Sequence, residues 1–287
     1  KTPMTQSLGL WMLATEAATA FDRATIQANS PTTSDQVAKN YKPKKKKIQP
    51  SNNNNTTEYR GVFKKGNMFY AQIRINQGSN SIPQHIGYFS TAKDAAQAYD
   101  LEAIQAQIMK MGGLVENAIL EAAISLETRD EERAEAVREG DKAIDALEEL
   151  INEEAARVIA LRAPTASDLR LVLSVIKVSA NLERIGDYAK NLAKRTGVLS
   201  QMEPVNGSAG ALRRKAKEVE GMLKDALDAY VARDAELAQD VIDRDIQVDQ
   251  MYNALFREFL TFMMKDPTNI TACMHLHFIA KNIERMG

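Results

Sequence analysis

The feature that most constrains the fold is a helical periodicity in the apolar residues, which runs from about residue 100 to the end of the chain. Apolar side chains recur every three to four residues there, while glycine and aromatic residues become scarce. Short breaks at "ETRDEE" and "RAPT" separate stretches of roughly 30 residues, which is typical of long antiparallel helices. We therefore predict a three-helix bundle over residues 101–200. Its first apolar stripe is Leu101, Ile104, Ile108, Met111, Val115, Ala118 and Ala122.

A second set of three helices is expected after the linker "MEPVNGSAG" (202–210). Two short segments of the first bundle are echoed in it, which indicates an internal duplication. The second bundle is therefore placed at residues 208–287, and the predicted fold class is mainly α, with two tandem three-helix bundles. The echoed pairs are "DKAID" (141–145) with "DIQVD" (245–249), and "LERIG" (182–186) with "IERMG" (283–287).

Pairs of acidic residues lie along the predicted buried stripes of the first bundle. Glu183 and Asp187 are four residues apart, so they lie one above the other on a helix face. Asp141 and Asp145 repeat that spacing on the preceding helix. Carboxylates that converge between two helices need a cation, shared protons or arginine partners. Oxygen donors without cysteine favour Mg²⁺, Mn²⁺, Ca²⁺ or iron over structural zinc.

Other interpretations of these acids stay open at this point. Acid pairs at this spacing are common on solvated helix faces, and Arg170 or Arg184 would neutralise them without any metal. Hydrolytic use of the carboxylates is not favoured, because no nucleophile–base pair or glycine-rich phosphate loop accompanies them.

Four further motifs are distinctive in the helical part of the chain: "MGGLVENAI" (111–119), "IDALEELI" (144–151), "ALRAPTASDLR" (160–170) and "ERIGDYAKNLAKR" (183–195). By these motifs the chain resembles, from about residue 98 onward, the PhoU family of bacterial phosphate-signalling regulators. The resemblance implies a non-enzymatic protein that links a phosphate ABC transporter to a sensor histidine kinase and represses the phosphate-starvation response. It implies a cytoplasmic location, membrane association only through partners, and a homodimer.

The family's acidic motifs bind multinuclear clusters of divalent or trivalent ions, such as iron, Mg, Mn or Zn, at the bundle surface. By resemblance, Glu183 and Asp187 are metal ligands with Asp141 and Asp145 beside them. The second bundle is expected to be truncated, because the acid that would match Asp187 falls after the last residue. Its remaining candidate ligands are Asp245, Asp249 and Glu284.

The N-terminal part of the chain has a different character. Residues 1–100 carry 13 Lys+Arg against 6 Asp+Glu, whereas the remainder carries 24 against 32. This asymmetry indicates two different roles, with nucleic acid as a partner for the basic part. The lysine- and asparagine-rich residues 42–57 are expected to form a linker, because they offer no apolar surface to bury.

Three short runs of aromatic and β-branched residues predict a three-stranded antiparallel sheet. They are "YRGVFKK", "MFYAQIRI" and "QHIGYF", separated by turns at "GN" and "NQGSNS". Thr91 and Asp94 then form the capping box of a helix that packs on the sheet. We expect one continuous helix to serve both this small α+β domain and the first bundle. The domain is placed at residues 58–100.

This domain resembles the Apetala/ethylene-response-factor (ERF) type of DNA-binding domain, and residues 1–41 resemble a partial second copy that is expected to be poorly ordered. In that family the sheet lies in the major groove of duplex DNA. The matching positions here are Arg60, Lys65, Phe69 and Arg74. The alternative functions are thus a DNA-binding transcription factor, which would be nuclear, with a helical interaction domain, or a chimeric chain of two unrelated proteins.

Overall fold

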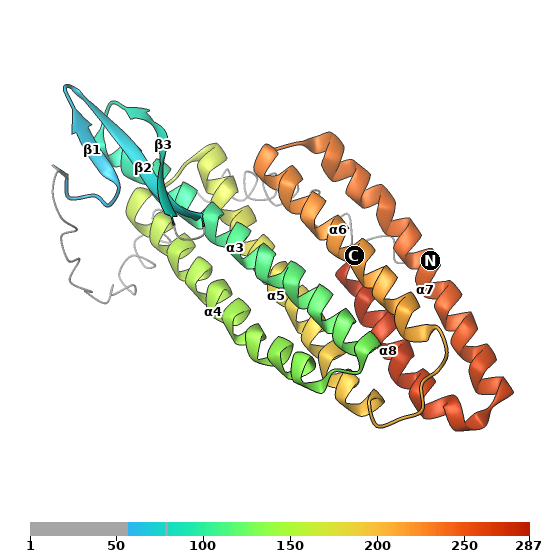
Figure 1. The fold of residues 1–287 in the computed structure, drawn as a ribbon. Helices are drawn as coiled ribbons and strands as arrows, with labels where there is room; N and C mark the ends of the chain where they lie inside the picture. Colours follow the sequence, from blue (N-terminus) through green and yellow to red (C-terminus); the bar gives the residue numbers. More distant parts are fainter. Residues whose placement is uncertain (1–56, 78–79) are drawn as a thin grey trace, which may run out of the picture. The chain divides into compact units, whose positions relative to one another are not determined.

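The computed structural model describes residues 57–77 and 80–287. Within these residues, a three-stranded sheet precedes six α-helices (Figure 1), so the predicted mainly helical fold class is confirmed. The partial repeat predicted at residues 1–41 lies outside the described residues. The chain divides into two compact units, and each is presented by itself. The described residues of unit 1 are Met109–Leu150 and Val178–Gly287, and those of unit 2 are 57–77, 80–108 and Ile151–Lys177.

The sheet of unit 2 is a meander of β1 (Val62–Lys65), β2 (Met68–Gln77) and β3 (Asn80–Phe89), all antiparallel and in chain order. Gly66 has a φ of +63° in the turn between β1 and β2, a conformation that glycine adopts without strain. β2 and β3 extend farther into "NQGSNS" than predicted, because their pairing continues to Gln77 and Asn80.

Helix α3 (Ala92–Thr128) packs its alanine face on the sheet. The N-cap bond of the predicted capping box is present, because Thr91 Oγ1 accepts a hydrogen bond from the Asp94 amide at 3.1 Å. The Asp94 carboxylate accepts a hydrogen bond from the Thr91 hydroxyl at 2.7 Å. Gly61 has a φ of +69°, and a Cβ there would lie 2.2 Å from the Tyr99 ring, so glycine is required for the close approach. The core of this module is Val62, Ala71, Ile73, Ala95, Ala96 and Tyr99.

α3 continues without a break through 37 residues, as expected for a helix that serves both the sheet and the first bundle. It is followed by α4 (Glu131–Arg162) and α5 (Ala166–Leu199). Within unit 1 the Ser125 and Thr196 hydroxyls join α3 to α5 at 3.3 Å, and Ser200 donates to Glu131 at the start of α4 at 2.5 Å. These contacts tie the three helices together at the end where α4 begins.

The second bundle consists of α6 (Ser208–Ala232), α7 (Ala235–Lys265) and α8 (Ile270–Met286), with a short 3₁₀ turn, Pro267–Asn269, before α8. The three helices pack side by side (Figure 1). Asp234 caps α7 by accepting from the Glu236 and Leu237 amides, each at 3.0 Å. In the described part of the chain, no helix combines the length and apolar character that a membrane span requires.

Candidate metal centre

The four predicted acids of the first bundle lie on facing parts of α4 and α5 in unit 1. Asp141 is the most buried, at 4% exposure, whereas the Asp187 side chain is 47% exposed and Asp145 is exposed. Glu183 is half-buried. The structure thus places this group at the bundle surface and not in its core. With Glu148, these residues interact electrostatically as one group, which we name the first acidic cluster: Asp141, Asp145, Glu148, Glu183 and Asp187.

Glycine at position 186 allows α5 to approach α4 closely at this cluster. A Cβ on Gly186 would lie 3.1 Å from Ile144 Cδ1 and 3.6 Å from Asp141 Oδ1. The first distance is shorter than an ordinary van der Waals contact, so a Cβ at this position would require the Ile144 side chain to shift by a few tenths of an ångström. The glycine between Glu183 and Asp187 therefore allows the close contact between α4 and α5 at the acids.

The carboxylates of the cluster repel one another. Burial, followed by the charge of Asp141, raises the pKa of Asp145. Burial, followed by the charge of Asp187, raises the pKa of Glu183. Both groups are therefore harder to ionise than an isolated carboxyl group, and a cation near them would reverse that effect.

Lys190 supplies the cation of this site from α5. Its Nζ lies 2.5 Å from Asp141 Oδ2 and 3.4 Å from Asp187 Oδ1. The hydrogen bond to Asp141 is the main reason why the pKa of Lys190 is raised. Lys190 is 41% exposed, so its flexible side chain can leave the acids without disturbing the core.

The donor chemistry of the cluster fits a hard cation, because it consists of carboxylate oxygens that already attract an ammonium group. In the described parts of the chain, no three Asp, Glu, His or Cys side chains are arranged so that they could hold a metal ion together. Lys190 occupies the position between Asp141 and Asp187 instead.

The second bundle carries a related group, the second acidic cluster, defined as Asp245, Asp249 and Glu284. A Cβ on Gly287 would lie 3.4 Å from Val248 Cγ1 and 3.6 Å from Asp245 Oδ1. Gly287 thus occupies the position that corresponds to Gly186, as the sequence echo predicts, but an added Cβ would make only ordinary van der Waals contacts there. Glu284 is ion-paired with Lys281 at 2.5 Å, and its side chain is 17% exposed.

Lys215 of α6 is a buried charge that the sequence analysis did not identify. It is 1% exposed, and its Nζ donates to the Val248 carbonyl at 2.9 Å and lies 5.2 Å from the Tyr252 ring centre. Burial lowers the pKa of Lys215 to about 8, against the attraction of Glu284 and Asp249. It is therefore mostly protonated at pH 7. The sequence does signal this buried charge, because Lys215 lies on the apolar stripe formed by Leu212, Ala216 and Val219.

Two other charged residues at the first acidic cluster were not predicted from the sequence, for different reasons. Lys190 follows Asp187 by three residues, a spacing that by itself also occurs in ordinary surface ion pairs. Glu148 follows Asp145 by three residues, and only the packing of α5 against α4 shows that it belongs with Glu183.

The outer face of the sheet in unit 2 carries aromatic and basic side chains. The rings of Phe63 and Tyr70 stack at 5.1 Å, and His85 lies 5.9 Å from Tyr70 and 4.7 Å from Tyr88. Lys65 Nζ lies 5.7 Å from the centre of the Tyr88 ring. We name this group the aromatic sheet face: Phe63, Lys65, Tyr70, Arg74, His85 and Tyr88.

The structure separates the residues that were predicted to contact DNA. Lys65 and Arg74 are exposed and belong to the aromatic sheet face, and Arg60 is exposed just before β1, 5.9 Å from the Tyr99 ring centre. Phe69 instead packs against the module's core. It alternates with Tyr70 along β2, and Tyr70 has the outward position.

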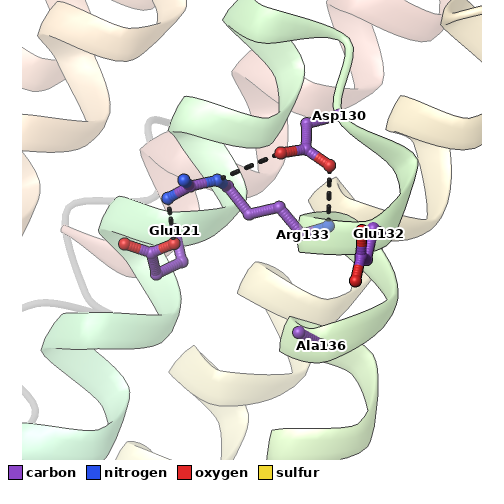
Figure 2. Close-up of a pocket in the computed structure, with 5 residues that line it drawn as sticks. All are labelled: Glu121, Asp130, Glu132, Arg133 and Ala136. Carbon is purple, nitrogen blue, oxygen red and sulfur yellow. Dashed lines mark hydrogen bonds and ion pairs between the residues drawn. The ribbon is translucent and has the colours of Figure 1, made fainter.

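A hollow of about 280 Å³ lies near the start of α4, beside residues of α3 (Figure 2). Arg133 extends across it, with its guanidinium group paired to Glu121 and, at 3.5 Å, to Asp130. The Asp130 carboxylate also accepts from the Arg133 amide at 2.9 Å and so caps α4. These ion pairs join α3 to the start of α4 across the α3–α4 turn.

Six helices in two sets of three, with a duplicated acidic motif, place the described chain in the class of mainly α helical-bundle proteins. The PhoU domain model matches residues 108–196 and 212–287. The chain therefore belongs to the PhoU domain family.

Its relatives include the "phosphate-specific transport system accessory protein PhoU homolog" of Caulobacter vibrioides, which is 44% identical over 188 residues, covering 66% of this chain and 82% of the relative. The homologue from Zymomonas mobilis is 45% identical over 188 residues, covering 66% of this chain and 79% of the relative.

Two crystal structures share the fold. PhoU from Pseudomonas aeruginosa superimposes with a TM-score of 0.63 at 37% identity, covering 65% of this chain and 90% of that protein. The phosphate transport system regulatory protein PhoU from Streptococcus pneumoniae gives 0.61 at 30% identity, covering 66% of this chain and 89% of that protein.

Proposed function

We propose that this chain is a non-enzymatic accessory regulator of phosphate transport that binds metal ions at the first acidic cluster. The observation that carries the proposal is the gathering of acids from α4 and α5 around one displaceable ammonium group, in a chain of the PhoU domain family. Relatives named as accessory proteins of the phosphate-specific transport system support the transporter as a partner. The family resemblance adds a sensor histidine kinase.

In this proposal Lys190 moves away from Asp141, and the carboxylates of the cluster hold the ion in its place. A bound cation supplies positive charge that lets the neighbouring acids stay ionised together. Asp141 provides the least exposed ligand, while Glu183 and Asp187 bring α5 into the same site. Metal binding would thereby fix the packing of α4 against α5. The surface formed by these two helices is one that a partner protein can recognise.

The test of the site is the metal content of purified protein after loading with Mn²⁺ or Fe³⁺ and gel filtration. We expect bound metal in the native chain and its loss in the double variant Glu183→Ala/Asp187→Ala. The matched control is Glu149→Ala/Glu153→Ala, an exposed acid pair with the same spacing on α4, which should keep the metal. Unchanged metal content in the Glu183/Asp187 variant would refute the site.

The regulatory role is tested in Caulobacter vibrioides depleted of its own PhoU homologue. We expect this chain to restore repression of a phosphate-starvation reporter when phosphate is plentiful, and the Glu183→Ala/Asp187→Ala variant to restore less. Full repression by that variant would show that the regulatory role does not depend on metal.

The aromatic sheet face supports a second function, the binding of duplex DNA. Exposed rings beside Lys65 and Arg74 combine stacking surface with positive charge, which nucleic-acid-binding surfaces use. We assign the aromatic contact to Tyr70, because Phe69 is turned toward the core.

Fluorescence anisotropy with a labelled duplex at several salt concentrations tests this function. Replacing Lys65 and Arg74 by alanine should weaken binding, and each lost phosphate contact should reduce the salt-dependence slope by about 0.9. Lys217→Ala, which removes an exposed lysine from α6, is the control. Equal affinity and slope in all three proteins would exclude the sheet as the binding surface.

A further inference from the structure

The two acidic clusters differ in which helix supplies the lysine that lies beside the acids. At the first cluster the cation is Lys190, a half-exposed residue of α5 that ends at the surface. At the second cluster a cation enters from α6, because Lys215 is 1% exposed and its Nζ donates to the carbonyl of Val248, which lies between Asp245 and Asp249 on α7.

The position of Lys215 has a counterpart in the first bundle. "VEGML" (219–223) corresponds to "VENAI" (115–119), and the same offset aligns Lys215 with Met111. Both side chains are buried, at 1% and 0% exposure. At the corresponding position the first bundle therefore has a buried methionine, whereas the second has a buried ammonium group.

The surroundings of Lys215 fix this ammonium group in place. Its Nζ is held at 2.9 Å from the Val248 carbonyl, and the ring of Tyr252 faces both Lys215 and Lys281, at 5.2 and 4.9 Å. Lys281 also pairs with Glu284 at 2.5 Å. Asp249 and Glu284 therefore already have a positive neighbour, Lys215, that cannot leave without opening the core.

We propose that Lys215 is a built-in cation of the second acidic cluster, and that it prevents this cluster from taking up a metal ion. A metal ion placed among Asp245, Asp249 and Glu284 would meet a buried ammonium group that cannot move into water, and like charges in a poorly solvated place repel strongly. This inference rests on the proposed function, in which the first acidic cluster binds metal. Together they confine metal binding to the first bundle.

Metal content after Mn²⁺ loading, measured for five proteins, tests the inference. Lys215→Met gives the second bundle the residue that the first has, with little change in volume. We expect Lys215→Met to bind about one additional ion per chain, in line with a newly formed carboxylate site. The additional bound Mn²⁺ should remain when Glu183→Ala/Asp187→Ala is combined with Lys215→Met. It should be lost when Asp245→Asn/Asp249→Asn is combined with Lys215→Met.

Thermal unfolding in Mn²⁺ and in EDTA is the second readout, and circular dichroism confirms that the variants are folded. In the Glu183→Ala/Asp187→Ala background, Mn²⁺ should raise the Tm only when Lys215→Met is also present. Should Lys215→Met misfold, Lys215→Leu replaces it in both measurements.

The inference is overturned if Lys215→Met binds no more Mn²⁺ than the native chain. It is also overturned if the native chain loses metal on Asp245→Asn/Asp249→Asn. A native chain without metal, together with a Lys215→Met variant that binds it through Asp245 and Asp249, supports the inference and refutes the proposed first site.

Discussion

At the scale of single residues, the first acidic cluster is a group of acids whose negative charge is only partly offset by Lys190. Asp141 is nearly buried and depends on Lys190 at 2.5 Å, whereas Glu183 has only acids as the charged neighbours that shift its pKa. Burial and these neighbours raise the pKa of Glu183 above its ordinary value of 4.5. The folded, metal-free chain therefore holds that proton more tightly than the unfolded chain does.

The raised pKa of Glu183 predicts how the stability of the metal-free protein depends on pH. A raised pKa in the folded state contributes stability below pH 4.5, and this contribution is lost as the pH rises through the folded-state pKa. At pH 7 in EDTA, Glu183→Gln should therefore stabilise the chain by about 0.3–0.5 kcal/mol, the usual cost of a like-charged pair at this spacing. The gain should vanish near pH 4, as urea unfolding at both pH values will show.

Saturating Mn²⁺ should reverse the order, because Glu183→Gln then lacks a ligand. Glu153→Gln, at an exposed position of α4, controls for the removal of one negative charge. A variant that is less stable than the native chain in EDTA at pH 7 would contradict the repulsion described for this cluster.

At the scale of elements, a glycine sets how closely two helices approach at the first acidic cluster. A Cβ at Gly186 would lie 3.1 Å from Ile144 on α4, whereas one at Gly287 would make an ordinary van der Waals contact with Val248 on α7. Both glycines follow a glutamate by three residues, so the same short motif stands in both bundles and makes the close contact in the first. The distance between α4 and α5 thus determines how close the acids of the two helices lie to one another.

Gly186→Ala should destabilise the chain by about 1 kcal/mol, because overpacking against Ile144 outweighs the gain in helix propensity. It should also weaken Mn²⁺ binding. Gly197→Ala on the same helix is the matched control: its Cβ would have nothing within 4 Å, so stability should be unchanged or rise by up to about 1 kcal/mol. Urea unfolding measures both, and equal effects would show that the contact with α4 is unimportant.

At the scale of the whole molecule, the sheet module is joined to the helices by side chains as well as by the chain itself. Tyr99 belongs to the sheet core, and its neighbour Asp100 pairs with Arg162 Nε at 2.9 Å. The guanidinium group of Arg162 also lies 4.9 Å from the ring of Tyr59. The helix α3 runs unbroken through the predicted boundary at residues 100 and 101, and the predicted domain limits stay a prediction.

Arg162→Ala should destabilise unit 2 by about 1–3 kcal/mol, because it leaves the carboxylate of Asp100, which is 14% exposed, without its nearest cation. Arg157→Ala is the matched control, since Arg157 lies 3.9 Å from the same carboxylate but is 46% exposed, and it should cost less than about 1 kcal/mol. Hydrogen exchange should increase in β1–β3 and at the start of α3 but not in α6–α8. Unchanged exchange in the sheet would rule out this link.

The sequence by itself determined the helical architecture, the duplication and the capping of α3, because these depend on periodicity and on contacts between near neighbours. The spacing of Glu183 and Asp187 likewise put both on one side of α5. Only the tertiary structure decided that Asp141 alone is buried and that Phe69 faces inward. It also brought Lys190 and Lys215 to the acids of other helices, since the depth and neighbours of a side chain are set by how the helices pack.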